Sequence, residues 1–393
     1  MKKLYIVTDR CIENRTEASL YTQYLQKNGY KKTDKLEEAD LIILFTCGFA
    51  EWRENMWMNI IKKIQKNKKK DAELIIGGCL SKINGEKVRQ IFSGTMIGPY
   101  EIDPLKDMLN LSGDLDSIMP VYFQRKNAGI VPKNLYSAHK YYYNQIFSRA
   151  CVIKVSSGCT GNCTFCAIKK AKSKLQSTSI ERIVESLEYG LEKGYRNIIL
   201  SADDLGSYGC DIGTDMFELL NKILKISSPQ AHKMEIRYLE PKWLIGNTGK
   251  FRDLLKDTEK ISFICIPIQS GSGKILKLMN RDDRIQECID CVNQLYEILP
   301  STFIRTHFIA GFPGETDDDF SKTLKLIDEM KFDIAQVYRY SDRQNIRASE
   351  LDNKVPEQIK KERAKLLETR IKNKTRMRSF IKYHRYRYCK LYR

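Results

Sequence analysis

The chain has 393 residues, 42% of them hydrophobic, which is enough to fill the cores of two domains. No segment reaches the roughly 18 to 20 consecutive apolar residues that a membrane-spanning helix needs, so a membrane protein is excluded and a cytoplasmic location is expected. The formal net charge of +18 is typical of a protein that binds a polyanion, or of a lysine-rich chain with a solvated surface. In a reducing compartment the twelve cysteines must be metal ligands or buried thiols, not disulfides.

Residues 1–125 are predicted to form an α/β domain with an open parallel sheet. Short, β-branched apolar runs predict buried strands at Leu4–Val7, Leu41–Phe45 and Leu74–Ile76. Helical spacing over Thr16–Lys27 and Glu51–Lys66 places helices between these strands. Such strand–helix–strand repeats fold as parallel sheets with helices on their faces. Residues 126–148 have little periodicity and are predicted to be a linker.

Residues 149–350 repeat the alternation on a larger scale. Strands are predicted at Val152–Ser156, Asn197–Ser201, Met234–Leu239, Ile261–Pro267, Phe303–Ile309 and Asp333–Tyr340, and helices at Ser179–Lys193, Asp283–Leu299 and Thr316–Met330. Six β/α units predict a partial (β/α)6 barrel, whose chemistry is expected at the C-terminal ends of the strands. Residues 351–393 are predicted to be one charged helix and a basic tail, with ten Lys or Arg and no Asp or Glu from Arg370 to Arg393.

Three cysteines follow the first barrel strand with the spacing CxxxCxxC, at Cys159, Cys163 and Cys166. Three thiolates on one short loop can bind three irons of a 4Fe–4S cube, whereas a structural cube normally has four cysteine ligands. No fourth cysteine lies nearby downstream, so the fourth iron is expected to be open to a small molecule. A zinc site with three cysteines and one histidine is the alternative, but the nearest histidine, His139, lies outside the loop.

Three further cysteines each follow a predicted strand of the first domain: Cys11, Cys47 and Cys79. The carboxyl ends of parallel strands share one edge of a sheet, so these thiols are expected to converge there. They are either a second three-cysteine cluster site or three separate buried thiols. No chemistry is assigned to the other six cysteines, of which Cys288 and Cys291 form a CxxC inside an amphipathic helix and are expected to face the core.

Together these motifs resemble the radical S-adenosylmethionine (SAM) methylthiotransferase family, over about residues 3 to 370. The resemblance includes Cys11-x-x-Asn14-x-x-Glu17, Thr46-Cys47, Gly77-Gly78-Cys79, Pro267-Ile-Gln269-Ser-Gly, Met279-Asn-Arg281 and Gly311-Phe-Pro-Gly-Glu315. The segments Cys163–Lys169 and Asp203–Gly209 most resemble the archaeal and eukaryotic branch, which modifies threonylcarbamoyl-adenosine in tRNA.

The resemblance implies two 4Fe–4S clusters and SAM as cofactors. The cluster on Cys159, Cys163 and Cys166 would bind SAM and split it to a 5′-deoxyadenosyl radical that takes hydrogen from the substrate carbon. The auxiliary cluster on the three N-terminal cysteines would carry the methylated sulfur and deliver it. A low-potential electron donor such as flavodoxin or ferredoxin is implied as a partner.

Four residues are predicted to line the SAM pocket. Phe165 would pack against adenine, and Asp203 would meet the ribose or the amino group. Arg237 would bind the carboxylate through two hydrogen bonds, and Gln269 begins a glycine-containing turn at the barrel mouth. Structural roles are open for each: a core aromatic, a helix cap, a surface ion pair and a turn residue.

The chain departs from the family pattern in ways that bear on the substrate. The C-terminal RNA-binding TRAM module of about 60 residues is not seen, and only the basic segment Arg370–Arg393 follows the last helix. In the barrel, Cys265 and His307 stand where the family usually has His and Asp, and Lys172-Ser173 replaces an expected Arg-Gly. The leading hypothesis is a tRNA methylthiotransferase, and the alternative is a methylthiotransferase that acts on a peptide or protein.

Two other classes of protein agree with part of the pattern. A zinc-stabilised basic RNA-binding protein agrees with the charge but not with the complete set of motifs. A cobalamin-dependent radical SAM methylase would also have an N-terminal α/β domain. Its Asp-x-His-x-x-Gly motif cannot occur there, because the first histidine of the chain is His139.

Overall fold

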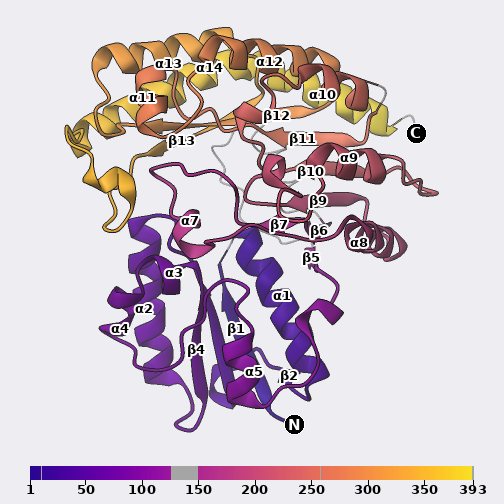
Figure 1. The fold of residues 1–393 in the computed structure, drawn as a ribbon, viewed down its shortest axis with the longest axis vertical. Helices are drawn as coiled ribbons and strands as arrows, with labels where there is room; N and C mark the ends of the chain where they lie inside the picture. The colour runs from indigo at the N-terminus through magenta and orange to yellow at the C-terminus, as the bar shows by residue number, and fades with distance from the viewer. Residues whose placement is uncertain (10, 125–148, 257, 392–393) are drawn as a thin grey trace.

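The computed structural model describes residues 1–9, 11–124, 149–256 and 258–391, and side chains as far as Thr375 with the exception of Asp116. The predicted linker 126–148 lies outside these residues. The described residues form two large sheets, one above the other in Figure 1, and a small two-stranded sheet. Over the described ranges, no helix has both the length and the apolarity to cross a bilayer.

The N-terminal sheet has four strands in the order β2-β1-β3-β4, all parallel. They are β1 (Lys3–Thr8), β2 (Lys31–Lys32), β3 (Leu41–Thr46) and β4 (Glu73–Gly78). The three predicted strands are confirmed, and the short edge strand β2 was not predicted. Every residue of β3 is buried, as expected of a central strand in a sheet that is covered on both faces.

Helices cover both faces of this sheet (Figure 1). One face packs against α1 (Ile12–Lys27) and α5 (Asp103–Leu109) through a core that contains Leu4, Phe45 and Leu105. The other face packs against α2, α3 and α4 through a core that contains Ile42, Trp57 and Leu80. The bounds of these helices are Glu51–Asn67, Cys79–Ile83 and Gly85–Arg89. Helix α1 starts four residues earlier than predicted, so its first turn follows Cys11 directly.

The second sheet has seven strands in the order β13-β12-β11-β10-β9-β6-β5 and stays open, with β13 and β5 at its edges. Six of them are parallel and follow chain order: β6 (Ala150–Lys154), β9 (Asn197–Ser201), β10 (Lys233–Ile236), β11 (Ile261–Cys265), β12 (Phe303–Ala310) and β13 (Ile334–Arg339). This arrangement is the expected partial barrel. A small antiparallel pair, β7 (Ser156–Ser157) and β8 (Gln176–Ser177), extends from its first strand.

The seventh strand, β5 (Val121–Gln124), was not predicted and comes from the N-terminal segment of the chain. It pairs antiparallel with β6. The N-terminal segment therefore contributes an edge strand to the barrel sheet, and helix α1 packs against both β5 and β6.

One face of the barrel sheet is covered by helices, which lie along the top and right of Figure 1. They are α8 (Ile180–Glu192), α9 (Met216–Leu224), α10 (Thr248–Leu255), α12 (Ile285–Ile298), α13 (Asp317–Glu329) and α14 (Glu357–Leu391). Two shorter helices, α7 (Ile168–Ala171) and α11 (Gly273–Leu278), lie at the strand ends. Helix α14 continues to Leu391, so the backbone of the predicted basic tail is helical.

Candidate active site

The three N-terminal cysteines come together at the C-terminal edge of the first sheet. Cys11 follows β1 and Cys47 follows β3, while Cys79 begins α3 directly after β4. All three are free thiols that are buried or half-buried. Cys47 acts electrostatically on Cys11, and both act on Cys79, so the three sulfur atoms form one neighbourhood. The three cysteines therefore lie together at one edge of the sheet, as predicted.

Two polar side chains join the three loops to one another. Asn14, in the first turn of α1, donates from Nδ2 to the carbonyl oxygens of Phe45 (3.2 Å) and Thr46 (3.4 Å), which connects the Cys11 loop to the end of β3. Thr46 donates from Oγ1 to the carbonyl of Gly77 at 2.6 Å, which connects β3 to the strand before Cys79. These bonds hold the sheet edge on which the thiols lie.

Glycine is required immediately before Cys79. Gly78 has φ +84°, and a Cβ there would lie 2.5 Å from the carbonyl oxygen of Thr46. A side chain at this position is thus excluded by backbone that cannot easily move. The glycine lets the chain turn from β4 into α3 while keeping Cys79 against its neighbours.

The second set of cysteines lies on the loop between β7 and α7. Cys159, Cys163 and Cys166 are half-buried free thiols. Cys166 acts electrostatically on Cys159, and Cys163 acts on Cys166, so this set also forms one neighbourhood. Gly158 before the loop has φ +80°, and a Cβ there would lie 2.4 Å from the carbonyl oxygen of Lys174.

The loop is held from several sides by groups of the barrel. Thr164 donates from its amide to the carbonyl of Met279 (3.0 Å) and from Oγ1 to that of Leu278 (2.8 Å). Asn280 donates from Nδ2 to the carbonyl of Asn162 at 2.9 Å. The Met279-Asn-Arg281 motif thus clamps the cysteine loop.

In the absence of metal, burial raises the pKa of the thiols and keeps them protonated at neutral pH. It raises the pKa of Cys47 to about 11, with Asp9 as the second cause. It raises that of Cys159 to about 12 and that of Cys166 to about 11, with neighbouring cysteines adding to the effect. Thiolate is the form that binds metal, so cluster binding would displace these protons.

The two cysteine sets provide thiol ligands of the kind that an iron–sulfur cube needs. In the described part of the chain, no group of three or more His, Cys, Asp or Glu side chains is spaced to bind one metal ion. The thiolates of a cube bind different irons and need not converge on one point. Each set consists of three neighbouring free thiols on fixed loops, so the residues present fit a three-cysteine cube.

A buried ionic network joins two units, the N-terminal sheet with its helices and the partial barrel. The network lies next to both cysteine sets. Lys172, just after α7, has its Nζ 2.8 Å from Asp203 Oδ2 and 3.4 Å from Glu13 Oε2. Glu13 belongs to the first turn of α1 and also accepts a hydrogen bond from Ser201. Lys172 is only 7% exposed, and Cys79 is among the groups that act on it electrostatically. The replacement noted at Lys172-Ser173 therefore lies at the contact between the units.

Asp203 lies just after β9 and Arg237 directly follows β10, and both already have protein partners. Asp203 Oδ2 accepts from the amide of Gly158 at 2.7 Å and from Lys172. Asp203 thus supports the cysteine loop. Arg237 has Nη2 2.8 Å from Glu235 Oε2, outside hydrogen-bond geometry, and its buried Nε has no partner.

Phe165 and Gln269 also have structural contacts. Phe165 packs edge-on against Phe312, with ring centroids 6.5 Å apart, in a small apolar cluster at the ends of β12 and β13. Gln269 adopts φ +75°, and its backbone bonds to His307 and Ile309. Its buried Oε1 has no partner, so this side chain retains an unused acceptor. A common SAM pocket for the four residues stays a prediction.

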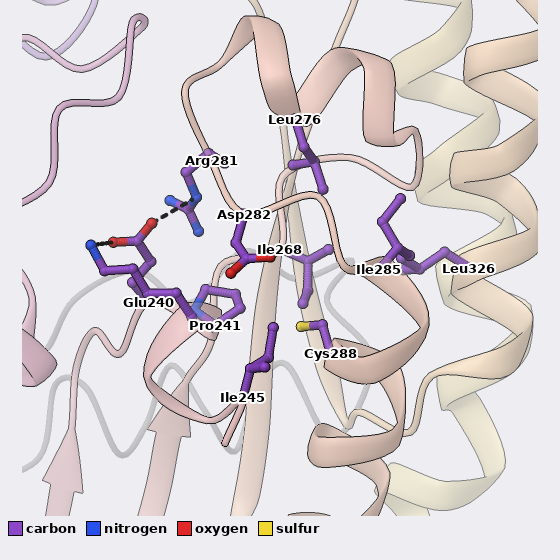
Figure 2. A pocket seen from close by; sticks show the side chains of 11 residues that line it. Glu240, Pro241, Ile245, Ile268, Leu276, Arg281, Asp282, Ile285, Cys288 and Leu326 are labelled. Atoms are coloured by element: carbon purple, nitrogen blue, oxygen red, sulfur yellow. Dashed lines mark ion pairs between the residues drawn. The ribbon is translucent and has the colours of Figure 1, made fainter. Parts of the chain in front are cut away.

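Figure 2 shows a pocket beside the cysteine loop whose lining includes none of the four predicted SAM residues. At its mouth Glu240 Oε1 lies 3.2 Å from Arg281 Nε. Arg281 also contacts Cys163 Sγ at 3.8 Å and donates to the carbonyl of Pro267 at 2.7 Å. The apolar lining, which includes Ile268 and Cys288, belongs to the core between the sheet and its helices. The pocket is therefore on the helix side of the sheet. In the sequence, the Met279-Asn-Arg281 motif was the feature that pointed to Arg281.

The two departures in the barrel interior contact each other. Cys265 Sγ lies 3.5 Å from His307 Nε2. Burial raises the pKa of Cys265 to about 11, and burial holds the pKa of His307 well below its usual value. The pair is thus a neutral thiol and a neutral imidazole. The ring of His307 lies between Tyr238 and Tyr338, with centroids 6.0 and 5.4 Å away.

The remaining cysteines with described side chains show no metal-binding arrangement. Cys151, Cys288 and Cys291 are buried in the barrel core, as predicted for the CxxC pair, and Cys210 is exposed. The side chain of Cys389 lies outside the described residues.

Comparison with known proteins gives family matches to two regions of the chain. Residues 153–327 match the Radical SAM superfamily, and residues 3–98 match the uncharacterized protein family UPF0004. The ribosomal protein uS12 methylthiotransferase RimO of Chlamydia felis is 28% identical over 93% of this chain and 77% of its own length. The RimO of Thermosipho africanus is 29% identical, covering 92% and 81%. The human threonylcarbamoyladenosine tRNA methylthiotransferase is 28% identical, covering 93% and 62%.

Among solved structures, the radical SAM methyltransferase TsrM of Kitasatospora setae superimposes with a TM-score of 0.60 at 11% identity, covering 86% of this chain and 75% of that one. This likeness shows the fold alone. These findings agree with the resemblance drawn from the cysteine motifs. They are the two matched regions, the uS12 and tRNA methylthiotransferase relatives, and the observed fold. The chain belongs to the radical SAM methylthiotransferase family and is an enzyme of that class.

Proposed function

We propose that this enzyme transfers a methylthio group to an unactivated carbon of a modified adenosine in tRNA. In this proposal Cys159, Cys163 and Cys166 hold the SAM-binding 4Fe–4S cluster. Cys11, Cys47 and Cys79 hold the auxiliary cluster. When bound, the clusters and SAM supply the electron, the hydrogen-abstracting radical and the sulfur for the reaction. The observation that carries the proposal is the pair of three-thiol sets on adjoining loops.

The chain's own residues position these centres. Asp203 and the Leu278–Arg281 segment fix the SAM-side loop, and Asn14 and Thr46 fix the auxiliary loops. Cys79 packs against an apolar cluster that contains Ala167 and Ala171. The two sets of thiols therefore lie on surfaces that touch each other. Phe165, Asp203, Arg237 and Gln269 stay proposed SAM contacts, with the unpartnered Arg237 Nε and Gln269 Oε1 as the atoms available to a ligand.

The substrate assignment is supported by charge and by one relative. The net charge of +18 favours a polyanion, and the ten basic residues from Arg370 to Arg393 fall largely on the helix α14. The human relative is named for threonylcarbamoyladenosine in tRNA. A protein side chain is the second candidate, because the relatives from Chlamydia felis and Thermosipho africanus are named for ribosomal protein uS12.

Mass spectrometry decides between these substrates. Nucleosides from bulk tRNA and digests of ribosomal proteins are compared between cells with and without the gene. The tRNA assignment expects a nucleoside with a methylthio group in place of hydrogen that disappears with the gene. Such a mass on a peptide and not on any nucleoside would establish the second candidate instead.

Binding of purified tRNA gives an independent test. If about six phosphates are neutralised, affinity should fall on the order of a thousandfold between about 50 and 200 mM salt. Removal of residues 376–393 should weaken binding and reduce the salt dependence. Salt-independent binding would contradict the tRNA assignment.

A further inference from the structure

One arginine contacts both cysteine loops at once. Arg343 lies in the segment between β13 and the short helix Arg347–Glu350. Its Nη1 donates to the carbonyl of Gly48 at 2.5 Å, and its Nη2 donates to the carbonyl of Phe165 at 3.2 Å. Gly48 follows Cys47 directly, and Phe165 precedes Cys166. A single guanidinium therefore spans the backbones of the two proposed cluster sites.

Neighbouring contacts hold this segment against both loops. On the auxiliary side, the Glu51 amide lies 3.4 Å from Ser341 Oγ, and the rings of Phe49 and Tyr338 are 5.7 Å apart. On the SAM side, Ala348 donates its amide to the carbonyl of Thr164 at 2.9 Å. The position of Arg343 is thus determined by contacts on both of its sides.

The charge of Arg343 also acts on both sites. Burial lowers the pKa of Arg343, and the groups that oppose this effect include Glu54, Cys166 and Cys47. An arginine remains protonated in proteins, so its charge lies near one cysteine of each set, Cys47 and Cys166. Glu54, the main acidic group acting on it, also accepts a hydrogen bond from Asn84 (3.2 Å) and lies 3.8 Å from Lys87. Arg343 Nε is buried without a partner.

We infer that Arg343 is a positioning residue that ties the two cluster loops together and raises the reduction potential of the clusters they hold. A nearby positive charge stabilises the state with one more electron, because adding that electron makes each thiolate-bound cluster more negative. The two hydrogen bonds keep the loops at a fixed separation. This inference depends on the two proposed cluster sites but not on the identity of the substrate.

The charge is tested by potentiometry of the iron-loaded enzyme. One-electron reduction by dithionite is followed by electron paramagnetic resonance in wild type, Arg343→Met and Arg343→Lys. The Met variant should make reduction of at least one cluster about tenfold less favourable, a shift of about 59 mV to lower potential. The Lys variant keeps the charge and should stay close to wild type. Arg339→Met, which removes an exposed arginine from β13, should also leave the potentials unchanged.

The two hydrogen bonds from Arg343 to the loops are tested by amide hydrogen exchange. Arg343→Met should exchange faster than wild type over residues 47–51 and 159–166, because methionine donates a hydrogen bond to neither carbonyl. Wild-type exchange or wild-type potentials in an iron-loaded Arg343→Met would overturn the inference. If the Met variant does not take up iron, its exchange compared with that of the iron-free wild type decides. A wild-type protein without two clusters would instead contradict the proposed function. The exchange result would still test whether Arg343 holds the two loops together.

Discussion

At the residue scale, two glycines set the direction of the chain directly before one cysteine of each set. Gly78 and Gly158 both have positive φ, and a Cβ on either would meet backbone within 2.5 Å. A cysteine after such a glycine is displaced if the glycine is replaced. The Gly-Gly-Cys79 and Ser-Gly-Cys159 sequences are therefore structural requirements of the sites and not general turn signals.

Gly78→Ala tests this requirement. Because the new Cβ would meet the Thr46 carbonyl, Cys79 should move and the auxiliary site should lose its iron, leaving about one cube of four irons. Gly113→Ala is the matched control, since Gly113 also has positive φ (+80°) but a Cβ there would meet nothing within 4 Å. Iron and acid-labile sulfide analysis measures the result. Equal iron content in both variants would contradict the role of Gly78.

Glu17 illustrates how a buried carboxyl behaves beside the auxiliary site. It is 2% exposed and accepts a hydrogen bond from the Tyr100 amide at 2.7 Å. Burial raises the pKa of Glu17 from 4.5 to about 7, against the opposing charges of Lys172 and Lys154. The folded state therefore binds this proton more tightly than the unfolded state, so stability from this group falls as pH rises from about 4.5 to 7.

Glu17→Gln should reverse that loss. At pH 8 the ionised carboxyl costs on the order of 3 kcal/mol, so the Gln variant should be more stable than wild type by up to about that amount. The difference should shrink toward pH 5, where Glu17 is protonated in the folded state. Urea unfolding under anaerobic conditions at both pH values measures it. A variant less stable than wild type at pH 8 would show that the carboxylate is needed in its ionised form.

At the element scale, the contact between the two units depends on short pieces of chain. The five-residue helix α3 packs against the four-residue α7, and β5 crosses over to pair with β6. Lys172 adds a buried ion pair to this contact. Small helices bury little area, so the ionic network is expected to determine how the units are oriented.

Lys172→Met would leave Glu13 and Asp203 buried without their cation, which costs about 3–5 kcal/mol. Lys172→Arg keeps the charge at this position and should recover most of the stability. Lys170→Met on α7 is the control, because Lys170 is exposed. Thermal unfolding measures the three variants. Similar stability for the two Met variants would contradict the importance of the buried pair.

At the scale of the whole molecule, the proposed function gives the two cysteine sets separate tasks within one enzyme. Replacing Cys11, Cys47 and Cys79 together by Ala should reduce the iron content from about eight to about four per chain. The remaining site should still cleave SAM to 5′-deoxyadenosine, while methylthio product should not form. Iron analysis and chromatography of the reaction products measure both. Loss of SAM cleavage with four irons retained would show that the auxiliary site is needed for both steps.

The sequence by itself determined the order of elements and the donor atoms. Apolar runs such as Leu41–Phe45 are buried in any parallel sheet, and the carboxyl ends of such strands share an edge. Cys11, Cys47 and Cys79 could therefore be placed together from the order of strands alone. The CxxxCxxC loop is local, so its three thiols are close whatever the rest of the fold does.

Only the tertiary structure decided how the two units meet. The contact of Arg343 with Gly48 and Phe165 joins residues 295 and 178 positions apart, and no periodicity reports such a pairing. The same holds for Lys172 with Glu13, for the Cys265–His307 contact, and for the partners that occupy Asp203 and Arg237. Periodicity records which face of an element is buried, whereas side-chain partners across domains depend on packing that no local pattern encodes.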